Sequence, residues 1–389
     1  MTGPKLGLIG KPNVGKSTIF SAMTEGSAEI GNYPFTTTKP NLGVAYFPVK
    51  CPHTELGTPC NPREGYCREG TRYIPVRIID VPGLIEGASQ GKGMGNEFLE
   101  NVRDSDAILL IYDASGHTAM DGSAEITAVT SPEEEIRMVL GELDSWLVSK
   151  LGSDWDKFAR KADSTGEPIG HSIQQKLSSY GVTLSQVHAI IASGNFPGKL
   201  LSWGKGELEE FSRLMFSTVK PVILVGNKAD LLETSPEAPE GSYFVSGDLE
   251  LALSRASRGG LVTESSTGVT PSPGLSPAQI SAVERMTEVF SRKWVTRIRE
   301  LLGQTVRDHL KLLVVYPVYD DRKWTDKEGN ILPDAFLMPE GTTAESLAFR
   351  VHTDIGNGFI KAINCRTGMV IGRDHSLEDG DIIRIISKS

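Results

Sequence analysis

The stretch Gly10-Lys11-Pro12-Asn13-Val14-Gly15-Lys16-Ser17 decides the fold of this chain, because it matches the pattern G-x-x-x-x-G-K-S/T at every fixed position. Residues 5–9 before it, which carry Leu6, Leu8 and Ile9, predict a short buried strand, and residues 18–23 after it predict a helix. A glycine loop between a strand and a helix is the setting in which this pattern binds the phosphates of a nucleotide. The alternative is a glycine turn that precedes a helix by chance.

Each residue type in this loop suits an anion. Gly10 and Gly15 have no Cβ atom, so the backbone can come close to phosphate oxygens. Amide groups of the loop and of the following helix then point at the phosphates. Lys16 would reach the β- and γ-phosphates, and the hydroxyl of Ser17 would bind Mg²⁺. The residues expected to contact the nucleotide here are Gly10, Lys11, Pro12, Asn13, Val14, Gly15, Lys16, Ser17 and Thr18.

Length and composition describe an ordinary globular chain. Its 389 residues suggest two or three domains, and 39% of them are hydrophobic and 23% charged. A net charge of −9 argues against coating of nucleic acid and makes DNA an unexpected partner, although a local basic patch stays open. No apolar run reaches the roughly 18 residues of a membrane span, and a strand that begins near Lys5 leaves no room for a signal peptide. With only four cysteines, we expect a reducing compartment, the cytoplasm.

Two further stretches predict loops that sense the γ-phosphate. Residues 31–40 are polar and bounded by proline, and the run Phe35-Thr36-Thr37 offers a threonine that could complete the Mg²⁺ shell. Residues 77–79 predict a strand that ends in Asp80-Val81-Pro82-Gly83, a D-x-x-G pattern. Asp80 would hold Mg²⁺ through water, and the Gly83 amide would respond to the γ-phosphate. The alternatives are a plain solvated loop and an ordinary aspartate at the end of a strand.

The stretch Asn227-Lys228-Ala229-Asp230 follows a predicted strand at residues 221–225 and points to a guanine base. The Asp230 carboxylate can accept hydrogen bonds from guanine N1–H and N2–H₂, donors that adenine lacks, so it selects GTP over ATP. Lys228 could lie over the base plane, and Asn227 could brace the loop. After the next short strand, the backbone of Ser246 and Gly247 could reach guanine O6. The alternative in both places is a polar turn after a strand.

Together these motifs resemble the Obg family of GTPases, in particular the archaeal relatives of its YchF branch. The resemblance is carried by residues 10–17, 33–37, 80–84, 91–95 and 227–230. It implies that Thr37 binds Mg²⁺ and the γ-phosphate, and that Asn13 helps to hold K⁺ near the phosphates. It also implies that Leu84 stands where many regulatory GTPases carry a glutamine that orients water, which leucine cannot do. YchF proteins of bacteria and eukaryotes end the base-reading motif in glutamate and favour ATP, whereas Asp230 here favours GTP.

The rest of the chain predicts a helical insertion and a separate C-terminal unit. Ser131-Pro132-Glu133-Glu134 is a typical helix start, and apolar residues recur at helical spacing on both sides of weaker helical pieces, so residues 120–215 are expected to be helical. Residues 254–275 are rich in Ser, Thr, Gly and Pro and predict a flexible connector. A terminal pattern at residues 375–381 resembles a TGS domain, a small β-grasp module, which implies a ribosome- or RNA-facing role. Residues 311–389 hold ten Lys and Arg against twelve Asp and Glu, so their charge does not itself support RNA binding.

The expected fold class is therefore α/β. An OBG-type GTPase domain with a P-loop would span residues 1–309 and carry the helical insertion, and a TGS domain would span residues 310–389. Within residues 343–359 we expect a single helix of that small domain.

Four side chains that metals favour lie between the two sensing loops: Cys51, His53, Cys60 and Cys67. Cysteine and histidine ligands suit tetrahedral Zn²⁺, but the spacing is not that of a standard finger. Unliganded thiols in an irregular loop are the alternative. Basic residues in the same loop make it a candidate contact for RNA.

We expect a GTPase that hydrolyses GTP to GDP and phosphate with Mg²⁺, using Lys16, Thr37 and Gly83 in catalysis and Ser17, Thr37 and Asp80 around the metal. A role in translation or on ribosomes rests on the resemblance alone. The alternatives are a nucleotide-gated RNA- or ribosome-binding module with negligible turnover and a YchF-like ATPase. A small-molecule kinase is disfavoured, because N-K-x-D together with D-x-x-G is typical of GTPases.

Overall fold

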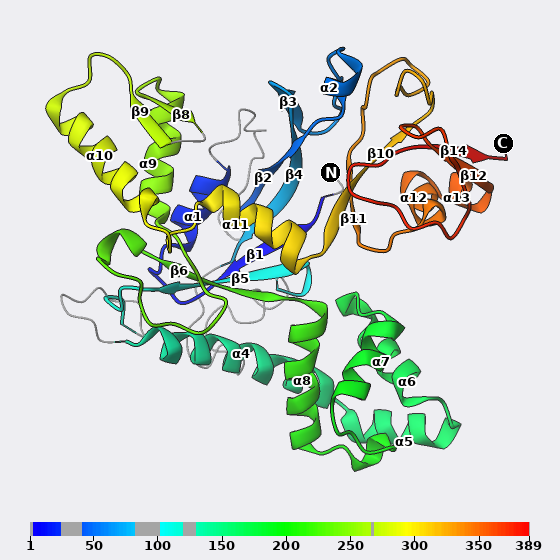
Figure 1. Cartoon of the computed structure of the whole chain (residues 1–389). Coiled ribbons are helices and arrows are strands. Elements are labelled where there is room, and N and C mark those ends of the chain that lie inside the picture. Colours follow the sequence, from blue (N-terminus) through cyan, green and yellow to red (C-terminus); the bar gives the residue numbers. More distant parts are fainter. Residues whose placement is uncertain (1–2, 25–40, 82–101, 120–129, 266–267, 389) are drawn as a thin grey trace. The chain divides into compact units, whose positions relative to one another are not determined.

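The computed structural model describes residues 3–24, 41–81, 102–119, 130–265 and 268–388 (Figure 1). The chain forms two compact units. One contains Lys5–Gly43 and Ile78–Ile298, and the other contains Met1–Pro4, Val44–Arg77 and Arg299–Ser389. The second unit therefore joins the cysteine-bearing stretch to the C-terminal residues, a grouping that the sequence did not suggest.

A parallel sheet forms the centre of the first unit. Strands β1 (Lys5–Ile9), β5 (Ala107–Asp113), β6 (Val222–Asn227) and β7 (Tyr243–Phe244) are neighbours in that order. Leu8 pairs with Leu109, which pairs with Ile223. All of β5 is buried, as expected for a parallel strand covered on both faces. Helices α1 (Lys16–Thr24) and α9 (Gly247–Arg258) pack beside each other.

The long strands β2 (Asn41–Lys50) and β4 (Thr71–Asp80) pass from one unit into the other, and the full order of this sheet is β2-β4-β1-β5-β6-β7. The short strand β3 (Tyr66–Arg68) pairs with β4, and the short helix α2 (His53–Leu56) follows β2. Since β4 ends at Asp80, the D-x-x-G aspartate lies at the carboxyl end of a strand, as its sequence pattern predicts.

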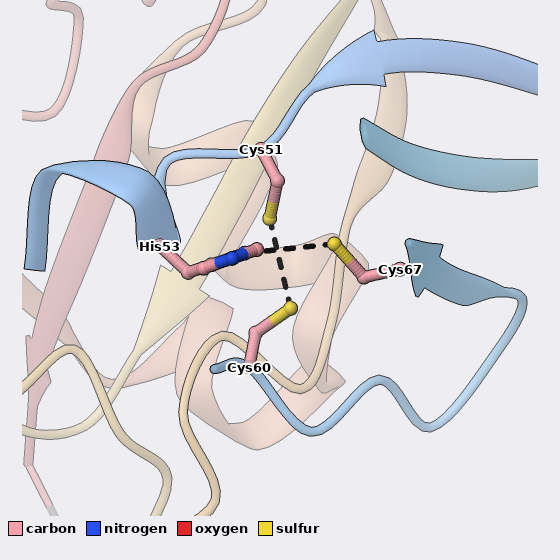
Figure 2. A group of neighbouring side chains, drawn as sticks. All are labelled: Cys51, His53, Cys60 and Cys67. Carbon is pink, nitrogen blue, oxygen red and sulfur yellow. Dashed lines mark hydrogen bonds between the residues drawn. The ribbon is translucent and has the colours of Figure 1, made fainter. Parts of the chain in front are cut away.

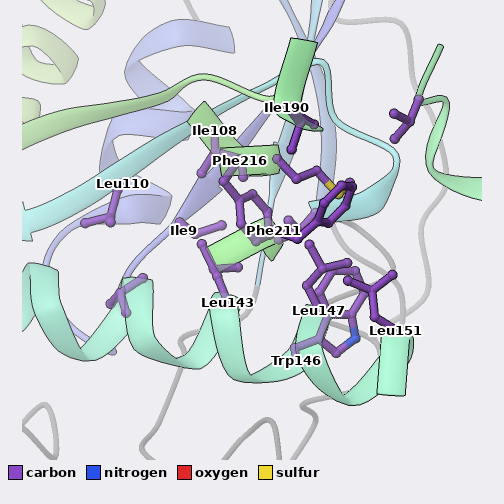
Figure 3. Close-up of a cluster of buried hydrophobic side chains, with 14 of the residues drawn as sticks. Ile9, Ile108, Leu110, Leu143, Trp146, Leu147, Leu151, Ile190, Phe211 and Phe216 are labelled. Carbon is purple, nitrogen blue, oxygen red and sulfur yellow. The ribbon is translucent and has the colours of Figure 1, made fainter. Parts of the chain in front are cut away.

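The helical insertion expected at residues 120–215 is present from Pro132 onward, and residues 120–129 of that expectation lie outside the described residues. It consists of α4 (Pro132–Gly152), α5 (Trp155–Thr165), α6 (Ile169–Lys176), α7 (Leu184–Ser193) and α8 (Lys205–Val219), with 3-10 turns η2 (Ser178–Tyr180) and η3 (Leu200–Ser202). Helix α4 begins at the expected place, where Ser131 and Glu134 cap each other's backbone amides. Figure 3 shows the apolar stripe of α4, with Leu143, Trp146 and Leu147, facing Phe211 and Phe216 of α8. These stripes form a core, as the sequence predicts.

The expectation of a flexible connector at residues 254–275 is wrong. Helix α9 continues to Arg258, and strands β8 (Val262–Ser265) and β9 (Gly268–Pro271) pair antiparallel. The physical reason is a small core in which Leu253 and Val262 meet Val283 and Met286 of α10 (Pro277–Ser291). The composition of residues 254–275 did not predict these contacts, because this stretch is rich in Ser, Thr, Gly and Pro.

The second unit holds a five-stranded sheet in the order β11-β10-β14-β12-β13. Its strands are β10 (Leu312–Val318), β11 (Phe336–Pro339), β12 (Phe359–Asn364), β13 (Val370–Ile371) and β14 (Ile382–Ser387). Before it come α11 (Ile298–Gln304) and the π turn η5 (Thr305–His309). The core under the sheet includes Leu347, Ala348, Phe359 and Ile383.

The single helix expected at residues 343–359 is wrong in detail, because it is two helices, α12 (Ala344–Val351) and α13 (Thr353–Asn357), followed at once by β12. His352 is extended between them, and its ring nitrogen accepts a hydrogen bond from the Asp354 amide. A side-chain cap therefore starts the second helix. Among the described helices of the whole chain, none combines the length and the apolar character that crossing a membrane requires.

Candidate nucleotide-binding site

The loop between β1 and α1 is wound too tightly for side chains at the two glycines of its motif. Gly10 and Gly15 have φ angles of 149° and 94°. A Cβ atom on Gly10 would lie 2.1 Å from the carbonyl oxygen of Ile111, and one on Gly15 would lie 2.1 Å from Nδ2 of Asn227. Asn13 also has a left-handed backbone, with φ of 62°. Such a loop presents backbone amides on its concave side.

Lys16 begins α1 and reaches across this loop. Its Nζ donates a hydrogen bond to the Lys11 carbonyl oxygen at 2.8 Å, and only 6% of the residue is exposed. Burial lowers the pKa of Lys16 to about 8, although the negative charge of Asp80 acts in the opposite direction. A phosphate group at the loop would compensate the buried ammonium far better than a carbonyl does.

Ser17 and Asp80 meet beside the loop. The Ser17 hydroxyl donates to Oδ2 of Asp80 at 2.8 Å. Asp80 is 7% exposed, and its Oδ1 has no hydrogen-bond partner among the described residues. A buried carboxylate oxygen without a partner, next to a hydroxyl, is a donor set that fits Mg²⁺, which prefers oxygen ligands and usually retains several waters.

Asn227 ties the base end of the site to the phosphate end. Its Nδ2 donates to the Val14 carbonyl oxygen at 2.8 Å, and its Oδ1 accepts from the Gly247 amide at 2.9 Å. The residue is 3% exposed. Asn227 therefore has the bracing position that its motif predicts. The Gly247 amide, which the sequence directed at guanine O6, is used by Asn227 in this structure.

Asp230 is oriented by Ser246 and lies near a cation. Its Oδ1 accepts a hydrogen bond from the Ser246 hydroxyl at 2.5 Å, and its Oδ2 is 3.8 Å from Nη2 of Arg285 on α10. Ser246 is also the N-cap of α9. Its hydroxyl therefore orients Asp230, a role that the sequence did not predict, and the contact of its backbone with guanine O6 stays a prediction.

Family comparisons agree with this geometry. Residues 5–142 match the model of the 50S ribosome-binding GTPase, residues 225–320 that of the Obg-like GTPase YGR210-like, G4 motif-containing domain, and residues 328–387 that of the TGS domain. The chain is 39% identical to an uncharacterized GTP-binding protein of Methanocaldococcus jannaschii, with 98% of each chain covered. The chain belongs to the YchF family of Obg-like GTPases.

Two further proteins are similar to this chain over nearly its whole length. The ribosome-binding ATPase YchF of Buchnera aphidicola is 27% identical, with 99% of each chain covered. The solved GTP binding protein of Pyrococcus horikoshii is 31% identical, covers 99% of this chain and 100% of its own, and has a TM-score of 0.77. These matches and the topology confirm the expected class, a P-loop GTPase fold with a C-terminal TGS domain.

Two acids of this YchF-family chain escaped the sequence analysis. Asp113 ends β5 and accepts from Nζ of Lys228 at 2.9 Å, so the ammonium that was expected near the base is held by a neighbouring strand end. Glu135 of α4 pairs with Nζ of Lys11 at 2.9 Å, and both side chains are almost fully buried. Burial raises the pKa of Glu135 to about 7. The one available signal was an acid ending the predicted strand beside the N-K-x-D strand.

Several expected site residues of the YchF motifs lie outside the described residues. They are Phe35, Thr36, Thr37, Gly83 and Leu84. The described part of the site nevertheless brings together residues from three separate motifs: the loop at Gly10, the aspartate at Asp80 and the base-reading stretch at Asn227.

Proposed function

We propose that this chain binds GTP with Mg²⁺ and hydrolyses it to GDP and phosphate. The observation that carries the proposal is the Asp230 carboxylate. It is oriented by Ser246 and lies three residues after Asn227, which braces the phosphate loop. A fixed carboxylate is suited to the paired N–H donors of guanine and offers no donor to the N1 acceptor of adenine.

In this proposal the phosphate end consists of Gly10 to Thr18. Loop amides and Lys16 stabilise the charge that develops on the γ-phosphate oxygens. Ser17, Asp80 and Thr37 would hold Mg²⁺, which when bound would neutralise charge on the β- and γ-phosphates. Asn13 would help to hold K⁺ near the phosphates. Phe35 and Thr36 would contact the nucleotide, and the Gly83 amide would sense the γ-phosphate. Lys228, Ser246 and Gly247 complete the base end.

Hydrolysis breaks the bond between the γ-phosphorus and the β–γ bridging oxygen while the oxygen of water bonds to that phosphorus, so GDP and inorganic phosphate leave. Leu84 cannot orient the water, because its side chain neither donates nor accepts hydrogen bonds. We propose that K⁺ or a partner supplies what leucine lacks. Single-turnover hydrolysis with and without K⁺ and ribosomes tests this, and negligible rates in every condition would favour a nucleotide-gated binding module.

An ATPase is the second candidate, because relatives over the whole length carry the name ribosome-binding ATPase YchF. Competition of GTP and ATP for one fluorescent nucleotide separates the two. Displacement by GTP at much lower concentration than by ATP supports the GTPase, and the opposite order supports the ATPase.

A ribosome or its RNA is the proposed partner, and the cytoplasm the proposed location. Support comes from the ribosome-binding names among the relatives and from the TGS match. We propose the division into residues 1–309 for the GTPase domain and 310–389 for the TGS domain as its working form. Co-sedimentation with ribosomes should differ between GDP and a non-hydrolysable GTP analogue, and an identical distribution in both would contradict a ribosome-linked switch.

A further inference from the structure

Outside the nucleotide site, four side chains of the kinds that ligate metals converge in the unit that contains Val44–Arg77 and Arg299–Ser389. Cys51 directly follows β2, His53 begins α2, Cys60 lies in the loop after it, and Cys67 lies on β3. Figure 2 shows all four side chains pointing toward one centre. Their ligand atoms all lie within 4.8 Å of one another.

The spacing of these atoms matches the edges of a zinc tetrahedron. Sγ of Cys51 and Sγ of Cys60 are 3.7 Å apart, and Sγ of Cys67 and Nδ1 of His53 are 3.5 Å apart. Zinc–sulfur bonds of about 2.3 Å and zinc–nitrogen bonds of about 2.0 Å at tetrahedral angles give a sulfur–sulfur edge of about 3.8 Å and a sulfur–nitrogen edge of about 3.5 Å. A disulfide would need its sulfurs about 2.05 Å apart, so Cys51 and Cys60 are not bonded.

A buried arginine beside the cluster provides an independent observation. Arg72 is 1% exposed, and its Nη1 lies 3.8 Å from Sγ of Cys60. Its other acceptors are the carbonyl oxygens of Leu332 and Pro333, each at 3.0 Å. Within the part of the chain that the structure describes, its Nε has no hydrogen-bond partner, and no carboxylate lies within ion-pair distance of Arg72. A buried guanidinium without a carboxylate is costly unless another anion offsets its charge.

Three thiolates, one neutral imidazole and one Zn²⁺ carry a net charge of −1, which the charge of Arg72 would offset. We propose that Cys51, His53, Cys60 and Cys67 bind one Zn²⁺. With four protein ligands the site is closed, so the zinc has a structural role and leaves no position for a substrate.

The zinc site would fix the loop between α2 and β3 to the C-terminal residues of its own unit. Between Cys60 and Cys67, the Asn61 amide donates to the Ile331 carbonyl oxygen at 2.8 Å. Arg63 forms ion pairs with Asp326 at 2.6 Å and with Asp334 at 2.9 Å. The metal therefore holds a stretch that is itself bonded to residues 326–334. This inference does not depend on the proposed GTPase activity.

The test is metal analysis of the full-length chain purified under reducing conditions in zinc-replete buffer. Wild type and the Cys365→Ser control, which alters the cysteine outside the cluster, should each hold one zinc per chain. Cys60→Ser and Cys67→Ser should lose most of it. Because these variants could fail to fold, wild type is also refilled with Co²⁺, and we expect the intense visible absorption of a tetrahedral thiolate site.

Native mass spectrometry on the same wild-type sample can show directly that zinc is not bound. An apo mass in zinc-replete buffer, together with only the weak absorption of octahedral Co²⁺, would overturn the proposal. Equal loss of zinc in Cys365→Ser and Cys60→Ser would overturn the ligand assignment.

Discussion

Asp230 is the residue on which the choice of nucleotide depends. Its carboxylate is oriented by the Ser246 hydroxyl and lies at the end of the stretch that Asn227 connects to the phosphate loop. Hydrogen bonds to a charged group are stronger than those between neutral groups. Replacing this carboxylate by a neutral amide should therefore lower the affinity for GTP.

Asp230→Asn should weaken GTP binding by about 100-fold, because one of two charge-assisted acceptors becomes a donor. The same change should improve binding of xanthosine triphosphate, whose ring offers an acceptor in place of the guanine amino group. Fluorescent-nucleotide titration measures both. Asp248→Asn, an exposed aspartate two residues after Ser246, is the matched control and should bind GTP like wild type. No difference between the two variants would contradict the role of Asp230.

Lys220 should make the free energy of unfolding of the first unit depend on pH. Its buried Nζ donates to the carbonyl oxygens of Val102 at 3.1 Å, of Ser105 at 2.7 Å and of Arg103. Burial lowers the pKa of Lys220 from its ordinary 10.5 to about 8. Between these values the unfolded chain binds more protons than the folded one, so the free energy of unfolding should rise as pH rises.

Urea unfolding of wild type between pH 8 and pH 10.5 should therefore show a gain of up to about 3 kcal/mol relative to Lys220→Met, which cannot titrate. Lys199→Met, at an exposed lysine, should keep the pH dependence of wild type. A wild-type curve parallel to that of Lys220→Met would contradict this.

At the scale of elements, helix α4 is joined to the phosphate loop by a buried ion pair. Lys11 of the loop is 0% exposed and Glu135 in the first turn of α4 is 1% exposed. Lys11 also donates to the Thr118 carbonyl oxygen. The helical insertion is thereby connected to the nucleotide site through its first turn.

Glu135→Gln should lower the free energy of unfolding at pH 8 by about 3 kcal/mol, because it leaves the buried ammonium of Lys11 without its counter-charge. Glu133→Gln, at an exposed position in the same helical turn, should change it by less than about 0.5 kcal/mol. Chemical denaturation monitored by tryptophan fluorescence compares the two. Equal stability of both variants would show that the pair contributes little.

Sequence reasoning succeeded for elements whose signals are local. The glycine loop, the strand ending at Asp80, the capping box at Ser131 and the base-reading stretch are each defined by a few neighbouring residues. It failed where the structure depends on contacts between residues that are far apart in the sequence. The hairpin at 262–271 forms because α10 covers it, and the pairs of Lys11 with Glu135 and of Lys228 with Asp113 join residues more than a hundred positions apart.

At the scale of the whole molecule, each compact unit is built from segments that are far apart in the sequence. Residues 44–77 belong with the C-terminal residues, because Arg72 bonds to Leu332 and Pro333 and Arg366 pairs with Glu55. No local sequence pattern predicts contacts between residues that are about 260 or more positions apart. The cysteine cluster lies inside this joined unit.

Removal of zinc should destabilise that unit. A strong zinc chelator with a reductant should lower the melting temperature of wild type by several degrees, because the metal's binding energy is lost from the folded state. Readdition of Zn²⁺ should restore it, and Cys365→Ser should respond as wild type does. If chelation leaves the melting temperature of both unchanged, the metal does not hold this unit together.

The nucleotide assignment is tested most directly by calorimetric titration of the wild-type chain with GTP and with ATP in the presence of Mg²⁺. The position of Asp230 predicts that GTP binds at least about 10-fold more tightly than ATP. Equal affinity for both nucleotides, tighter binding of ATP, or no binding of either would contradict it.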